Sequence, residues 1–344
     1  MKLTFRKFGL ALSLGVMTLG FAPSANAAAL AYTWLGGTSG DWSTSANWSG
    51  NVAAPTKGTY VDPRITVGNT SGNPGAALIY SSAQGYTNYS TTQTRTLYIR
   101  NGEMRITGGT LEASGNCGNF DGMGDCAKDT IFTITDGEYR ITRTNTFNGF
   151  NVHYRSTGNA TVNIEGGTFA ADSILFDYTA SIAPSASGNA IVNLNNGGTL
   201  LTGSVNKVIN ATSTVVSTFN FNGGTFKVRV AGGTFGADGA HANLAYAYVK
   251  TGGAKIDTNS FDYTITQNLL AGTAGSGGLT KDGNGTLTIT SAGNTYTGAT
   301  TVNLGKLVVN GSIAASSGVS VAAGASLGGS GTVSVISGAG SVGP

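Results

Sequence analysis

The sequence predicts an all-β protein, a right-handed parallel β-helix (solenoid) that follows a short N-terminal cap. Three observations support this prediction. The chain of 344 residues holds 54 glycines, it has no stretch of ten or more residues with a convincing helical period, and one short phrase around a glycine turn recurs along it. A unit this short cannot bury its single apolar face alone, so the copies are expected to stack on one another.

Residues 1–27 have the features of a secretory signal peptide. A basic segment at 2–7 precedes an apolar run at 8–21, and Ala-Asn-Ala at 25–27 fits a cleavage site with small residues. The apolar run is about 14 residues long, shorter than the roughly 20 that a membrane span needs. The mature chain is therefore expected to be secreted, extracellular or on the cell surface, with no membrane span.

Residues 28–62 are expected to form a Trp-rich N-terminal cap that holds all three tryptophans, Trp34, Trp42 and Trp48. Their indoles could cover the open end of the solenoid core or stack on a bound glycan. The first interpretation is favoured, because solenoids need atypical terminal units and Trp buries a large area.

Residues 63–275 are predicted to form degenerate rungs, because they hold the recurring phrase. The copies are MRITGGTL (104–111), FTITDGEY (132–139), VNIEGGTF (162–169), VNLNNGGTL (192–200), FNFNGGTF (219–226) and VRVAGGTF (228–235). The copies are spaced unevenly, which fits coils of about 20 to 30 residues with inserted loops. An antiparallel sandwich or barrel is the alternative, disfavoured because the phrase recurs in one orientation without Asn-Gly hairpin turns.

The period of two before each glycine turn predicts which side chains share a face. One side should carry the apolar pairs Met104/Ile106, Phe132/Ile134, Val162/Ile164, Val192/Leu194, Phe219/Phe221 and Val228/Val230. The other side should carry the polar residues between them, Arg105, Thr133, Asn163, Asn193, Asn220 and Arg229.

Residues 276–344 contain the segment GGLTKDGNGTLTITSAGNTYTGATTVNLGKLVVNG (277–311). It resembles the autotransporter-associated β-strand repeat, also called the passenger-associated transport repeat, of secreted bacterial proteins. The matching residues are Gly278 to Lys281, Gly283, Gly285 to Leu287, Asn294 to Gly298, Thr300 to Val302, Gly305 and Leu307. The resemblance implies a parallel β-helix in an exported, often surface-associated protein, and it carries no catalytic residues across.

The net charge of the mature chain and the composition of its C-terminal segment suggest which partners it has. Of 19 Lys and Arg, three lie in the signal, which leaves 16 against 16 acids. A neutral chain gives no electrostatic support for a nucleic-acid partner, and it favours association. The segment 318–344 has no charge and no bulky group to cover a last rung, so a homo-oligomer or filament through the β-helix ends is expected. Surface glycans and other extracellular proteins are further candidate partners.

Cys117 and Cys126 enclose eight residues. In an exported protein they are expected to form a disulfide. A redox or metal pair is disfavoured because no His or third Cys accompanies them.

No residue pattern predicts a catalytic, cofactor or metal site. The acid groupings are Asp172/Asp177, Asp257/Asp262 and the trio Asp121, Asp125 and Asp129. Asp172 and Asp177 are an odd number of residues apart and should face opposite sides of a straight strand, and the trio lacks the dense spacing of a calcium loop. His153 and His241 are expected at the surface. The sequence thus predicts an exported structural or adhesive surface protein that is not an enzyme; the alternative is a polysaccharide lyase or hydrolase.

Overall fold

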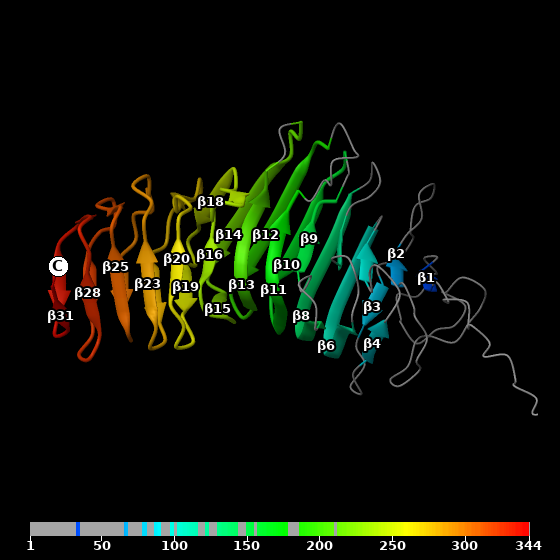
Figure 1. The fold of residues 1–344 in the computed structure, drawn as a ribbon, viewed down its shortest axis with the longest axis horizontal. Coiled ribbons are helices and arrows are strands. Elements are labelled where there is room, and N and C mark those ends of the chain that lie inside the picture. Colours follow the sequence, from blue (N-terminus) through cyan, green and yellow to red (C-terminus); the bar gives the residue numbers. More distant parts are fainter. Residues whose placement is uncertain are drawn as a thin grey trace, which may run out of the picture.

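The structure is a computed structural model that describes residues 32–34, 65–67, 78–80, 86–90, 97–99, 102–115, 121–123, 129–143, 149–154, 157–177, 186–209 and 212–343. These residues form strands and turns, and none of them is helical. Figure 1 shows the strands stacked in chain order along the longest axis of the molecule. The predicted all-β parallel solenoid is confirmed.

Each turn of the solenoid crosses three faces. Strand β10 (Ala160–Ile164) lies on face 1, and β11 (Thr168–Phe176) crosses face 2 and then face 3. The chain then returns to face 1 in β12 (Asn189–Asn195), where Val162 is in parallel register with Val192.

The remaining strands continue these faces in both directions. Face 1 also holds β3 (Leu78–Tyr80), the first parts of β6 (Gly102–Gly115) and β8 (Thr130–Arg143), β14 (Val216–Asn222), β18 (Tyr246–Val249) and β21 (Leu270–Ala271). Face 2 holds β4 (Tyr86–Ser90), the second parts of β6 and β8, the first part of β13 (Thr199–Val208), β15 (Thr225–Val228), β19 (Ala254–Asp257), β22 (Leu279–Asp282), β24 (Thr300–Val302), β27 (Val319–Val321) and β30 (Ile336–Gly338).

Face 3 runs from the first described strand to the last. It holds β1 (Tyr32–Trp34), β2 (Ile65–Val67), β5 (Leu97–Ile99), β7 (Asp121–Met123), β9 (Gly149–Val152), the second part of β13, β16 (Gly233–Phe235), β20 (Tyr263–Ile265), β23 (Thr286–Ile289), β25 (Lys306–Val309), β28 (Ser326–Gly328) and β31 (Ser341–Val342). Strand β26 (Ser312–Ile313) pairs with β29 (Thr332–Val333) in a small separate sheet, and β17 (His241–Ala242) pairs antiparallel with β13.

The recurring phrase sets the register of face 1. Its two apolar positions form two buried columns, Met104, Phe132, Val162, Val192 and Phe219, and Ile106, Ile134, Ile164, Leu194 and Phe221. The prediction is wrong for Val230, which is exposed. Val228 ends β15 on face 2, and the glycines that follow it lead into β16 on face 3. The copy VRVAGGTF therefore spans the corner between faces 2 and 3, whereas the other copies span the corner between faces 1 and 2.

The side chains that fill the core, and the length of the turns around it, change along the solenoid axis. Phe132, Tyr139, Phe150 and Phe169 pack against one another, with ring centroids 5.0 to 5.9 Å apart. Turns shorten toward the C-terminal end: partners are 30 residues apart at Val162↔Val192 and 17 apart at Ser320↔Ser337. The solenoid accordingly narrows toward that end (Figure 1), where buried Leu, Val and Ile replace most of the aromatic core.

Several predicted features lie outside the described residues: the signal peptide at 1–27, Trp42, Trp48, Cys117 and Cys126. Of the predicted cap, only β1 with the main chain of Trp34 is described, and it pairs in parallel with β2. Within the described part of the chain, no helix is long and apolar enough to cross a membrane.

Candidate functional site

The outward side of face 1 carries a column of polar side chains, one threonine and three asparagines. Thr133, Asn163, Asn193 and Asn220 occupy the same register position on β8, β10, β12 and β14. Asn193 Nδ2 donates to Asn163 Oδ1, and Asn220 Nδ2 donates to Asn193 Oδ1, both at 2.8 Å. We call this surface, with Asn195, Asn222, Tyr246 and Tyr248, the amide face.

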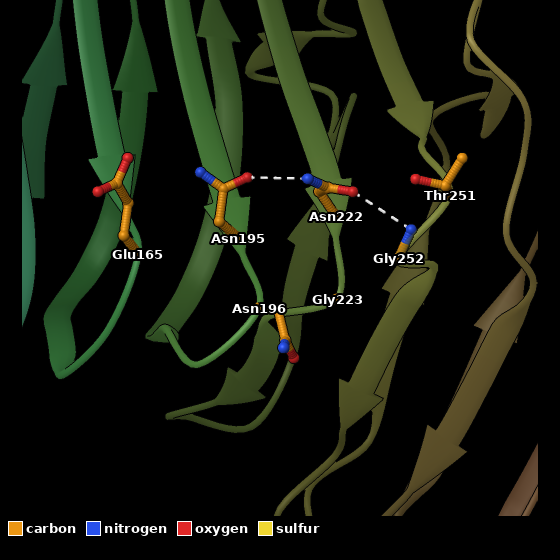
Figure 2. A pocket seen from close by; sticks show the side chains of 7 residues that line it. All are labelled: Glu165, Asn195, Asn196, Asn222, Gly223, Thr251 and Gly252. Atoms are coloured by element: carbon orange, nitrogen blue, oxygen red, sulfur yellow. Dashed lines mark hydrogen bonds between the residues drawn. The ribbon is translucent and has the colours of Figure 1, made fainter.

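A second amide ladder runs along the edge of this face, where the strands turn toward face 2. Figure 2 shows Glu165, Asn195 and Asn222 on successive rungs. Asn222 Nδ2 donates to Asn195 Oδ1 at 3.1 Å, and the main-chain N–H of Gly252 donates to Asn222 Oδ1 at 3.2 Å. No such bond joins Glu165 to Asn195 among the residues drawn (Figure 2).

These side chains line a hollow of about 670 Å³. Its walls are Glu165, Asn195, Asn196, Asn222, Gly223, Thr251 and Gly252. Amides, a hydroxyl and one carboxylate therefore face the solvent together, and they offer both hydrogen-bond donors and acceptors. The hollow holds no apolar side chain large enough to bury an apolar ligand.

Two tyrosines lie on the same face. Tyr246 and Tyr248 point outward from β18, while Ala247 and Val249 between and after them are buried. Their rings are stacked, with centroids 5.4 Å apart and an interplanar angle of 17°. Tyr248 is in register with Asn220, so it continues the first amide ladder by one rung. The alternation in the segment AYAYV (245–249) is the sequence signal for this pair, and it lies outside the copies of the recurring phrase.

The acids singled out in the sequence do not converge. Asp172 forms an ion pair with Arg229 at 2.9 Å, whereas Asp177 is fully buried. The two carboxylates are not brought together, and Asp177 lies beyond the end of β11, which itself crosses from face 2 to face 3, so the expectation for a straight strand does not apply to them. Asp257 pairs with Lys227 at 3.3 Å. Asp262 accepts a hydrogen bond from the Thr286 main-chain N–H, which lowers the pKa of this carboxyl.

The prediction of a surface position is wrong for His153, which is fully buried. Its Nε2 lies 3.0 Å from the carbonyl oxygen of Gly158 and 3.1 Å from that of Ser187, so Nε2 carries a proton and donates. Burial lowers the pKa of His153 and raises that of Asp177, which also lies 3.9 Å from Lys207 Nζ. His153 follows β9 and Asp177 follows β11, both outside the recurring phrase, so no pattern in the sequence predicted their burial.

The other candidate residues have structural surroundings. His241 is partly exposed and pairs with Asp238 at 2.9 Å. Asp129 accepts hydrogen bonds from the main-chain N and Nδ2 of Asn159. The Asp121 side chain and Asp125 lie outside the residues whose side chains are described. In the described portion, no group of three or more His, Cys, Asp or Glu could hold a metal ion.

The segment 277–311 turns its characteristic polar residues inward. Lys281 is fully buried, and its Nζ lies within hydrogen-bond distance, 2.7 to 3.0 Å, of four acceptors for its three protons: Thr258 Oγ1, Asp282 O, Gly283 O and Leu304 O. Asn294 Nδ2 donates to the carbonyl oxygens of Ser291 and Ser312. Tyr296 is buried, with its hydroxyl 2.8 Å from Thr300 Oγ1. These residues join successive rungs.

Lys281, Asn294 and Tyr296 all lie within the segment that resembles a known repeat. Residues 279–309 match the passenger-associated transport repeat. The match confirms the resemblance on which the sequence analysis relied. Comparisons with curated proteins and with solved structures gave no match. The repeat and the solenoid together fit an exported, passenger-like protein, and the repeat is typical of bacterial extracellular or surface proteins.

Proposed function

We propose that this protein is secreted by a bacterium and serves outside the cell, or on its surface, as a non-catalytic structural or adhesive solenoid. The observation that carries the proposal is the passenger-associated transport repeat at 279–309, built into the C-terminal part of a continuous parallel solenoid. Its characteristic side chains are used for rung-to-rung hydrogen bonds, which suits a scaffold better than a reaction centre.

The alternative of polysaccharide cleavage has weaker support. A hydrolase needs two carboxylates that face each other across a groove. Asp172 is neutralised by Arg229, and Asp177 is buried beside Lys207. The hollow on the amide face has one carboxylate, Glu165, among its lining residues.

We further propose that copies associate end to end. The rung of β30 and β31 exposes apolar side chains, with 57% of Val342 accessible. Among the described residues, no strand pairs with the outer edge of β30 or β31. Such edges add strands readily, and a second copy in the same orientation would extend into a filament.

Localisation tests the proposal. The full chain is produced in its own bacterium, and its position is followed by fractionation and by immunogold imaging. We expect it outside the cytoplasm, and a variant lacking residues 8–21 should remain in the cytoplasm. A cytoplasmic full chain, or release of reducing sugar ends from polysaccharides by the purified protein, would contradict the proposed function.

A further inference from the structure

We propose that the amide face binds a neutral polysaccharide chain, with Tyr246 and Tyr248 as the aromatic contact and the hollow beside Thr251 as a polar subsite. This deepens the proposed adhesive function and rests on it, since an adhesive protein needs a ligand outside the cell. Three features of this face support the proposal: the aromatic pair, the amide ladders and the charged groups.

The aromatic pair is placed for contact with a ligand. Tyr246 leaves 42% of its surface accessible, although residues of this size normally bury their rings. Tyr246 stacks on the Tyr248 ring, and Lys250 is the next residue along the chain on the same side of the strand. A sugar ring presents a face of C–H groups, and such a face packs against an aromatic ring while its hydroxyl groups stay free at the rim.

The hollow lies within reach of a ligand held on these rings. Thr251 follows Tyr248 by three residues, and the chain turns there, with Gly253 N–H donating to Lys250 O, so Thr251 lies no farther away than the roughly 10 Å of an extended chain. A short oligosaccharide spans this distance, so one ligand can contact the ring and the hollow together. The ladders fix Asn195 and Asn222 by hydrogen bonds, so little side-chain entropy is lost when they bind.

The chemistry of the hollow matches hydroxyl groups. Amide side chains present a donor and an acceptor side by side, as a sugar hydroxyl requires. Asn196 and Glu165 are exposed, and Thr251 adds a hydroxyl. Glu165 directly follows β10 and Lys250 directly follows β18, at the register position of Asn195 and Asn222, so one carboxylate and one ammonium stand at the two ends of this column. This arrangement favours a neutral chain over polyuronates, which would meet Glu165 at the hollow.

Affinity electrophoresis of the full-length secreted protein provides the test. Native gels contain dextran, glucomannan, hydroxyethylcellulose or, as the charged comparison, polygalacturonate. We expect one or more of the neutral polymers to retard the protein. Tyr248→Ala should weaken binding at least tenfold, Tyr248→Phe should bind like the unmodified protein, and Asn196→Ala, which leaves both ladders intact, should weaken binding severalfold.

Leu304→Ala is the matched control, because Leu304 is an exposed apolar residue in the repeat, away from this face. It should leave binding unchanged. Circular dichroism melting checks each variant, and if Tyr248→Ala unfolds, the exposed Tyr246→Ala takes its place. Retardation by none of the neutral polymers, retardation by polygalacturonate alone, or unchanged binding by a folded tyrosine variant would overturn the proposal. Localisation is measured separately, so a surface protein that binds no glycan refutes the site while the proposed function stands.

Discussion

At the scale of single residues, the most informative position is Lys281. A buried ammonium is costly unless every proton finds an acceptor. Three main-chain carbonyls and the Thr258 hydroxyl surround its Nζ, and they belong to three successive rungs. The lysine of the repeat thus joins rungs through their corners, and it does so without contact to solvent.

Lys281→Met is expected to destabilise the solenoid by about 2–4 kcal/mol, because it leaves these buried acceptors without a donor. Chemical denaturation followed by circular dichroism measures the loss. Lys306→Met is the control, since Lys306 is exposed in the same repeat and its replacement should change stability by less than about 0.5 kcal/mol. Equal effects of the two variants would show that the Lys281 hydrogen bonds contribute nothing.

The buried Lys281 should also make the stability of the protein depend on pH. Burial lowers its pKa from 10.5 to about 8. Between these two pH values the unfolded chain binds more protons than the folded one, so the Lys281 contribution to stability rises with pH, by at most about 1.4 kcal/mol per pH unit. The stability difference between the unmodified protein and Lys281→Met should therefore grow from pH 8 to pH 10. A difference that is flat or falls over this range would contradict the lowered pKa.

At the scale of elements, the corner between faces 1 and 2 determines how closely rungs stack. Gly137 and Gly167 occupy equivalent corners with positive φ angles of 77° and 61°. A Cβ on Gly167 would collide with the carbonyl oxygen of Gly137 one rung below. The GG of the recurring phrase is therefore required both by the turn and by the neighbouring rung.

Gly167→Ala is expected to cost about 3 kcal/mol or more, because strain at positive φ adds to a main-chain collision. Gly232→Ala separates the two effects. Gly232 also has a positive φ, 73°, but a Cβ there would meet nothing within 4 Å. Gly232→Ala should therefore lower the free energy of unfolding by only about 1 kcal/mol. Thermal melts of both variants measure the two losses of stability. If Gly232→Ala is destabilised as much as Gly167→Ala, the collision is not the main cause of the Gly167→Ala destabilisation.

At the scale of the whole molecule, each rung forms parallel strand pairs with the rung before it and leaves an edge on which the next rung can pair. Strand lengths and turn lengths fall toward β31, and the edge there exposes Val335 and Val342. A terminal rung has one stacked neighbour where an inner rung has two, so it gains less stability from its interfaces. Association through this edge is the consequence that we expect in solution.

Sedimentation of the secreted protein tests this association. Over a tenfold rise in concentration we expect species heavier than a monomer, and Val342→Lys should shift them toward the monomer because charge on an edge strand opposes pairing. Lys substitution of Leu304, exposed away from this edge, serves as the control. A single monomeric species at every concentration would refute end-to-end stacking.

The recurring phrase determined most of the fold. Period-two alternation placed Phe132, Ile164 and Phe221 inside, and the glycine turn placed the corners, because both depend on neighbours in the chain. The same reasoning failed for Val230, where the phrase crosses a different corner. Local alternation does not say which face a strand occupies.

The sequence alone also determined the repeat at 279–309 and the outward position of Asn163, Asn193 and Asn220. Only the tertiary structure decided that these amides form a ladder, that Tyr248 continues it, and that Lys281, His153 and Asp177 are buried. Most of those contacts join residues on neighbouring turns, such as Lys281 and Thr258, 23 positions apart, or Asn193 and Asn163, 30 apart, and their geometry depends on the rise and register of successive turns. The alternation within one rung determines which way a side chain points. The residue that this side chain contacts lies on the neighbouring rung, so it depends on how the rungs are stacked.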